Sequence, residues 1–226
     1  MGTFLSLSGV INATDKDVEH AMMAWVQQRQ GRFERATGET AEGNSTEAIL
    51  ATNRHTVTLL YPNHFIDWDE ASAHISKQLK CPVFSFHIHD GDLWMFTLFH
   101  SGDEVAWFNP RPDYWDDIDA EERRKWAGDA NAIAARIPGL VPDAISEYFV
   151  SWSDKLSDSK AKAYPNDEFE YGTDWQMVDF MKRLDLIYPV ESDRIIGMKY
   201  HLEIPDRKTR VVTAIQKIRK PWWKIR

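Results

Sequence analysis

The chain has 226 residues, a formal net charge of −8, 43% apolar residues, 12% aromatic residues and ten tryptophans. This composition supports a packed core and excludes disorder of the whole chain, and the lack of any run of about eighteen apolar residues excludes a membrane-spanning helix. The single Cys81 cannot form an internal disulfide, and the first residues lack the basic region of a signal peptide. We therefore expect a cytoplasmic protein that does not act at a membrane.

The charge is unevenly distributed along the chain. The segment Arg207–Arg226 carries eight Lys or Arg and no Asp or Glu, so the other 206 residues carry 19 basic and 35 acidic side chains, a net −16. An acidic body argues against general nucleic-acid binding, because phosphates would be repelled. A basic end of this kind can bind the acidic body, a neighbouring molecule or an external polyanion.

The first elements follow from hydrophobic periodicity. Residues 3–11 alternate as in a strand, and Thr14 is a suitable N-cap for a helix that ends near Gly31 or continues to Arg35. Residues 49–61 predict a second strand, perturbed at Asn53. Asp67, with Glu70 three residues later, predicts a capping box for a helix over 68–80.

A three-stranded meander over 81–115 forms the centre of the predicted fold. Asp90-Gly91 lies between two aromatic-rich runs and predicts a two-residue hairpin turn, since both residues tolerate positive φ. A second tight turn is predicted at 101–104. The prolines at 110 and 112 then end strand pairing, because they remove two backbone donors.

The remaining chain is predicted to be largely helical. We expect helices over 121–137 and 142–152, an exposed loop over 153–166, and a helix over 174–184 that Thr173 and Gln176 open as a capping box. Residues 195–204 and 209–218 predict a final hairpin around Pro205–Lys208. The order predicts an α+β fold with an antiparallel-dominated sheet, as a single domain 1–226 with a subdivision at 115/116 as the alternative.

Several short motifs in this order resemble a bacterial protein family of uncharacterised function. They cover roughly Asp67 to Pro189 and consist of Pro82, Asp90-Gly91-Asp92, Phe108-Asn109 with Pro112-Asp113-Tyr114-Trp115, Trp126-Ala127-Gly128-Asp129, and Leu184-Asp185-Leu186-Ile187-Tyr188-Pro189. Because the activity of that family is unknown, the resemblance implies a fold and no chemistry.

Histidines in the meander raise a metal hypothesis. His87 and His89 share one face of a strand, and a two-residue turn would pair His89 with Asp92, so these three could bind a metal ion. His100 would lie roughly 20 Å from His87 at the usual strand rise. The simpler interpretation is a half-exposed sheet face, and we expect no cofactor.

Acidic residues offer a second catalytic hypothesis. Asp167, Glu168 and Glu170 could act as general acids or bases, or bind a cation, but a solvated loop before a helix explains them more simply. The chain has no Gly-x-Ser-x-Gly elbow, no Gly-rich phosphate loop and no local Cys signature with His. Enzymatic activity therefore has no motif that supports it.

The segment 109–115 is the strongest candidate for a binding surface. It holds Asn109, Arg111, Asp113, Tyr114 and Trp115 in a proline-rich loop, and Arg, Tyr and Trp are the residue types enriched in binding hot spots. Tyr114 and Trp115 could instead simply cover the edge of the meander. In the tail, Trp222 and Trp223 among basic residues could stack on bases or rest at a membrane surface, or could anchor the tail to the acidic body.

These observations predict a non-enzymatic protein-interaction module that binds another protein. More specifically, it could be an immunity-type protein that binds a basic toxin. One alternative is a metal-dependent hydrolase that uses His87, His89 and Asp92, with the acids at 167–170. A second is polyanion binding through the basic tail. An exposed hairpin edge could also pair across a homodimer.

Overall fold

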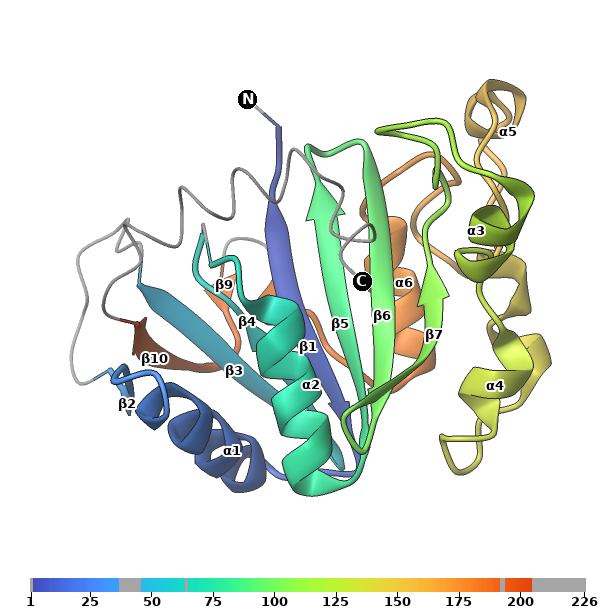
Figure 1. The fold of residues 1–226 in the computed structure, drawn as a ribbon. Coiled ribbons are helices and arrows are strands. Elements are labelled where there is room, and N and C mark those ends of the chain that lie inside the picture. Colours follow the sequence, from blue (N-terminus) through green and yellow to red (C-terminus); the bar gives the residue numbers. More distant parts are fainter. Residues whose placement is uncertain (1, 37–45, 64, 192–193, 205–226) are drawn as a thin grey trace.

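One eight-stranded antiparallel sheet organises the protein, with strand order β2-β10-β3-β4-β1-β5-β6-β7 (Figure 1). The structure is a computed structural model that describes residues 2–36, 46–63, 65–191 and 194–204. Its strands are β1 Leu5–Ile11, β2 Arg32–Arg35, β3 Glu47–Asn53, β4 Thr56–Leu60, β5 Pro82–His89, β6 Leu93–His100, β7 Asp103–Phe108, β8 Val190–Glu191, β9 Arg194–Ile195 and β10 Met198–Glu203. Its α-helices are α1 Asp15–Gln27, α2 Trp68–Leu79, α3 Ala120–Lys125, α4 Ala130–Ala134, α5 Asp154–Asp158 and α6 Gln176–Arg183. The predicted α+β class with an antiparallel sheet is confirmed.

The two faces of the sheet are buried by different parts of the chain. Helices α1 and α2 cover one face, where Val10, Trp25 and Ile75 belong to one apolar cluster (Figure 1). Helix α6 covers the other face, where Phe180 packs among Phe84 and other aromatic rings. Because successive strand residues point to opposite faces, β1 and β5 contribute to both clusters, with Leu7 and Phe84 in one and Val10 and Val83 in the other.

The N-terminal third follows its local sequence signals closely. Thr14 caps α1 as predicted, since its hydroxyl accepts the Asp17 N–H while Asp17 accepts the Thr14 N–H at 3.0 Å. The helix ends at Gln27, and the chain reverses at Gln30, where φ is +56°, into the unpredicted strand β2. The predicted strand over 49–61 is a hairpin of β3 and β4, because Arg54 adopts a positive φ and turns the chain.

The meander is confirmed, but its first turn is one residue longer than predicted. His89 pairs with Leu93 and His87 with Met95, so residues 90–92 form a three-residue loop. Asp90 and Gly91 both have positive φ, and the Asp92 N–H donates to the His89 carbonyl at 2.9 Å. Asp92 therefore lies in the loop and does not pair with His89.

The second half contains less regular helix than predicted over 121–152, and the short helix α5 where a loop was predicted over 153–166, because the Ser153 hydroxyl caps its first turn. The expected helix over 121–137 divides into α3 and α4 at Gly128, where φ is +78°, and the expected helix over 142–152 consists of two 3₁₀ turns, Pro142–Ala144 and Ser146–Tyr148. Neither of the two later capping boxes forms. Asp67 makes no side-chain cap, and α6 starts after Trp175 without a side-chain cap.

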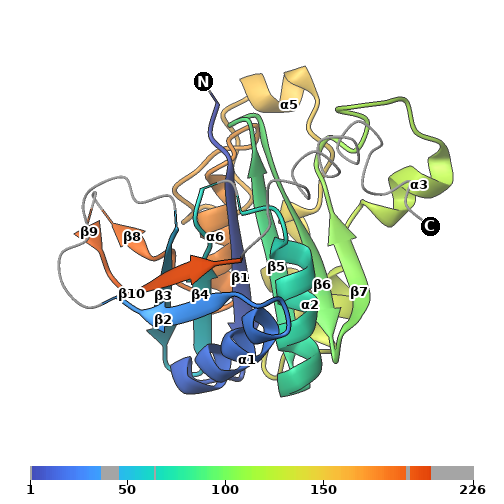
Figure 2. The ribbon, with the colours of Figure 1, turned by 60° about the vertical axis from the view of Figure 1, so that its left-hand side comes forward.

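Strand β10 joins the end of the described chain to its beginning. It lies between β2 and β3 and pairs antiparallel with both, so residues on either side of position 115 share one sheet (Figure 2). The predicted partner of this strand over 209–218 lies outside the described residues. Among the described residues, no helix has the length and apolar character needed to cross a membrane.

Candidate functional site

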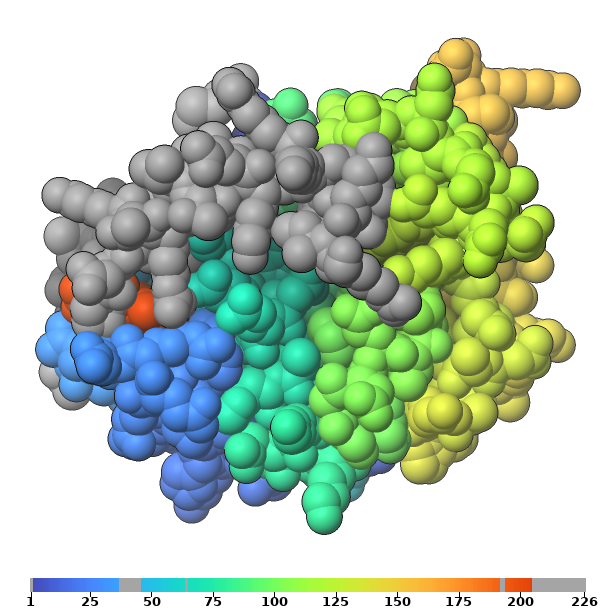
Figure 3. All heavy atoms as spheres, in the orientation of Figure 1, coloured from blue at the N-terminus to red at the C-terminus, as the bar shows by residue number. Residues whose placement is uncertain are grey.

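A cavity of about 800 Å³ opens at the edge of the sheet where β1 begins and where β4 and β5 end. The start of α2 and the segment after Pro112 form its other walls. Figure 3 views the molecule from the helical face, where the side chains of α2 lie between those of α1 and those of the β6–β7 hairpin. The lining includes the aromatic residues Phe4, Trp68, His87, His89 and Trp115 and the polar residues Asp69 and Ser85.

The sheet registers explain why polar side chains gather beneath α2. Ser6 of β1 lies beside His87 of β5, which in turn lies beside Met95 of β6. One row further along, Ser85 of β5 lies beside Thr97 of β6. Directly paired residues share a face of the sheet. At this end, the face beneath α2 therefore carries a polar band instead of an apolar core.

His87 is held as a neutral imidazole. Its Nδ1 lies 2.9 Å from the Ser6 hydroxyl, and its ring stacks on the Trp68 indole with centroids 4.6 Å apart. Burial lowers the pKa of His87 to about 3, the charge of His89 adds to this shift, and the Leu5 carbonyl partly opposes it. The ring borders the cavity but is closely surrounded by protein atoms, so a charged imidazolium would be poorly solvated.

His89 connects strand β5 to the loop over residues 109–115. Phe4 and Trp115 meet its ring edge-on, at centroid distances of 5.0 and 4.9 Å, and Tyr114 lies at 5.8 Å. Burial lowers the pKa of His89, and the neighbouring Asp90 and Asp92 oppose that shift. Two candidate sites that lie more than twenty positions apart in the sequence therefore adjoin in the structure.

The five predicted binding residues have different roles. Asn109 is buried, and its side-chain oxygen accepts the Arg111 N–H at 2.9 Å, so it shapes the loop and does not present itself for binding. Asp113 forms an ion pair with Arg123 at 3.1 Å on the surface. Only Tyr114 and Trp115 join the cavity region, and both are half-buried.

The three predicted metal ligands do not converge. Asp92 accepts a short hydrogen bond from the Tyr114 hydroxyl, while His87 contacts Ser6 through Nδ1. His100 pairs with Pro82 at the opposite end of β5. Within the described ranges, no group of three or more His, Cys, Asp or Glu side chains is arranged to hold a metal ion.

Asp69 is the cavity residue that the sequence analysis missed. Burial raises the pKa of its carboxyl group to about 6, with the Ser85 hydroxyl opposing the shift and the charges of Glu104 and Glu70 adding to it. Acids in the first turn of a helix are normally explained by the helix dipole, so the sequence gives no signal that Asp69 faces a cavity. Ser85 beneath it is 2% exposed, and its hydroxyl makes no hydrogen bond of regular geometry in the described structure.

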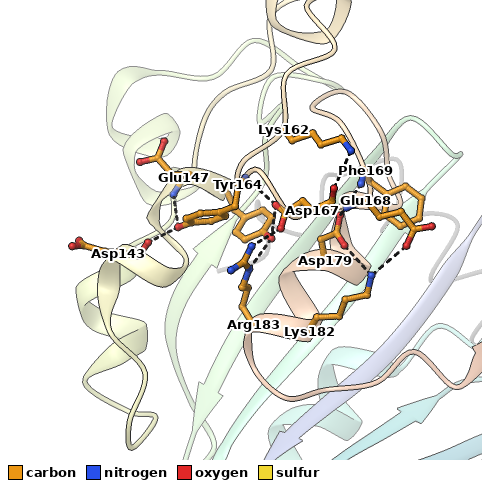
Figure 4. Close-up of polar contacts among 11 residues, drawn as sticks. Asp143, Glu147, Lys162, Tyr164, Asp167, Glu168, Phe169, Asp179, Lys182 and Arg183 are labelled. Carbon is orange, nitrogen blue, oxygen red and sulfur yellow. Dashed lines mark hydrogen bonds and ion pairs between the residues drawn. The ribbon is translucent and has the colours of Figure 1, made fainter.

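The acids at 167–170 belong to a structural network at α6 (Figure 4). Asp167 is buried, accepts the Tyr148 hydroxyl at 2.8 Å and pairs with Arg183 at 2.5 Å. Asp179 accepts the backbone N–H groups of Glu168 and Phe169, each at 2.7 Å.

The expected solvated loop is therefore wrong for Asp167, because its carboxylate fastens the segment to α6. The Glu170 carbonyl accepts the Thr173 hydroxyl at 2.8 Å, which closes the turn before α6. The aromatic cluster of α6 and Tyr148 covers the opposite face of the sheet from α2, so these acids do not meet His87.

Comparison of the chain with protein-family models, with curated proteins and with solved structures finds no match. The resemblance of residues 67–189 to a bacterial family is thus neither supported nor contradicted, and the chemistry of the cavity region is the basis for assigning a function.

Proposed function

We propose that the protein is a non-enzymatic module that binds another protein through an aromatic surface formed by Phe4, His89, Tyr114 and Trp115. The observation that carries this proposal is the convergence of these four rings from three separate segments beside an open cavity. Phe4 is 52% exposed, which is unusual for a phenylalanine that already contacts other rings. Aromatic residues at the rim of a pocket are typical anchors of protein interfaces.

The surface is held in place before any partner arrives. The Tyr114–Asp92 hydrogen bond joins the loop to the β5–β6 turn, and the Asp113–Arg123 ion pair joins it to α3. Asn109 closes the turn at Arg111. A surface that is already ordered loses little conformational entropy on binding, and this favours affinity.

The charge of the body supports a basic partner. Apart from the segment 207–226, the chain carries a net −16, and a field of this sign accelerates association with a cationic protein. An immunity-type protein that neutralises a basic toxin is the narrower form of the proposal.

The two alternatives have less support. A metal-dependent hydrolase would need His87, His89 and Asp92 to turn toward one ion, but the hydrogen bonds to Ser6 and from Tyr114 occupy two of the three. Polyanion binding by the basic tail falls outside the described residues and stays a prediction from sequence.

Capture of partners on the immobilised full-length chain tests the proposal. We expect one protein, identified by mass spectrometry and repurified, to bind the parent chain in calorimetry. Phe4→Ala and Trp115→Ala should each weaken that affinity about tenfold or more, as is usual for hot-spot residues. Val141→Ala is the matched control, because Val141 is a large apolar side chain that is 59% exposed and lies outside the cavity lining. Equal losses in all three variants would contradict the proposed surface.

A further inference from the structure

We propose that the cavity beside the aromatic surface binds an organic cation, a guanidinium or alkylammonium group, with Asp69 as the counter-ion. This inference deepens the proposed function, because the cation would be an Arg or Lys side chain of the basic partner. It rests on that function only for the source of the cation. The residues that line the cavity favour a cation whatever its source.

The described lining of the cavity carries negative charge. The described residues that line the cavity include Asp69 and Asp116 and no Lys or Arg. The two lining histidines do not neutralise Asp69 at neutral pH, because burial lowers the pKa of both His87 and His89. A concave space whose described lining carries negative charge and no Lys or Arg favours a cationic ligand.

The walls of the cavity are aromatic. Trp68, Trp115 and Phe4 border the same space as Asp69, and the neutral His87 ring extends the Trp68 face through its stack. Indole faces attract guanidinium and ammonium groups, most strongly when the cation has lost its water. Aromatic rings around a carboxylate are the usual composition of sites for such cations.

The floor of the cavity is polar and incompletely hydrogen-bonded. The Asp69 carboxylate loses hydration, and the charged groups that shift its pKa, Glu104 and Glu70, are themselves acids. Ser85 lies below it with a hydroxyl that makes no regular hydrogen bond among the described residues. A half-buried carboxylate that has lost part of its hydration is stabilised by a nearby cation, so the floor of the cavity is more stable when a cation enters.

The ionisation of Asp69 makes this binding pH-dependent. Only the charged carboxylate attracts a cation, so affinity should fall as the pH drops below about 6. The other titratable groups around it include Glu70 on α2, Glu104 on β7, His87 and His89 on β5, Tyr61 after β4 and Asp116 beyond the loop. Burial lowers the pKa of both histidines, and protonation of either one at low pH would repel a cation, so neither would reverse the trend.

Calorimetric titration of the full-length chain with N-acetyl-L-arginine amide tests the inference, with N-acetyl-L-citrulline amide as the neutral isostere. We expect the arginine probe to bind at least tenfold more tightly than the citrulline probe at pH 7.5, and about tenfold more weakly at pH 5 than at pH 7.5. Tetramethylammonium chloride separates the two sources. If tetramethylammonium binds as tightly as the arginine probe, the site is assigned to free small cations. That result would overturn the inference that the cation is a side chain of the partner.

Asp69→Asn should reduce arginine binding about tenfold, whereas the neighbouring Glu70→Gln, which removes the same charge from a side chain that is 64% exposed, should not. A full-length variant with the eight basic residues of 207–226 changed to Gln tests the chain's own tail. Tighter probe binding to it would identify the tail as a competitor and support cation specificity.

Equal binding of the arginine and citrulline probes, or no arginine binding to either the parent or this tail variant, would overturn the inference. Failure to capture a protein partner while the arginine probe still discriminates would contradict the proposed function alone.

Discussion

The Trp68 indole lies flat on the His87 imidazole, with ring centroids 4.6 Å apart and planes 3° from parallel. Trp68, the first residue of α2, thereby covers the end of β5 that lies next to the 90–92 loop. This stack removes His87 from water and forms one wall of the cavity, so the ionisation of the histidine and the shape of the site depend on the same contact.

Replacing Trp68 should therefore change the titration of His87. In Trp68→Ala, water reaches the ring, and we expect the pKa of His87 to rise from about 3 toward its ordinary value of about 6.5. NMR titration of the His ring protons measures this shift. Trp107→Ala, at a tryptophan on β7 outside the cavity lining, should leave it unchanged. An unchanged His87 pKa in Trp68→Ala would show that the stack does not control its hydration.

His87 should also make the protein sensitive to acid. Its pKa is lower in the folded state than in the unfolded state, so the unfolded chain takes up a proton first as the pH falls below about 6.5. The stability of the folded state is thus lost progressively from that pH down to about 3. Between pH 7 and pH 5, the free energy of unfolding of His87→Gln should fall by about 2 kcal/mol less than that of the parent. Urea unfolding at the two pH values measures this difference. Equal losses of unfolding free energy in the variant and the parent would contradict a buried neutral imidazole.

Asp69 has the opposite linkage. Its pKa is higher in the folded state than in the unfolded state, so its stabilising contribution is present at low pH and is lost as the pH rises through about 6. Without a ligand at pH 7, Asp69→Asn should therefore be more stable than the parent by about 1 to 3 kcal/mol. Urea unfolding at pH 7 and pH 4 checks this, because the gain should largely vanish at pH 4. A gain of the same size at both pH values would assign it to packing instead of charge.

The Asp167–Arg183 pair predicts a large loss of stability when it is broken. The Asp167 side chain is 3% exposed, so Arg183→Leu leaves a buried carboxylate without its cation and should cost about 3 kcal/mol. Adding Asp167→Asn should recover part of that loss. Arg123→Leu breaks the exposed Asp113–Arg123 pair and should cost less than about 1 kcal/mol in the same denaturant series.

Local signals were sufficient for the parts of the fold that close within a few residues. The Thr14 N-cap and the meander are both confirmed, because each depends on neighbours in sequence. The 90–92 loop was mispredicted by one residue, since Asp92 donates its N–H to the His89 carbonyl instead of pairing in the ladder. That single residue moved Asp92 out of the proposed metal set.

The candidate site could be predicted only in part. His87, His89 and Trp115 were identified by residue type, but their proximity depends on how the loop after β7 returns over the β5–β6 turn. Asp69 and Ser85 had no distinguishing pattern, because an acid in a first helical turn and a serine in a strand are ordinary features. Their significance arises only where α2 crosses the end of β5.

The position of β10 has a consequence for the order in which the protein can fold. Among the described strands, β2 pairs only with β10, which is separated from it in the chain by more than 160 residues. During synthesis, strands β1, β3, β4, β5, β6 and β7 can assemble early, while β2 waits without a ladder until residues 198–203 leave the ribosome. Such a long loop closure is slow, so the β2 edge should be the last part of the sheet to acquire protection from hydrogen exchange.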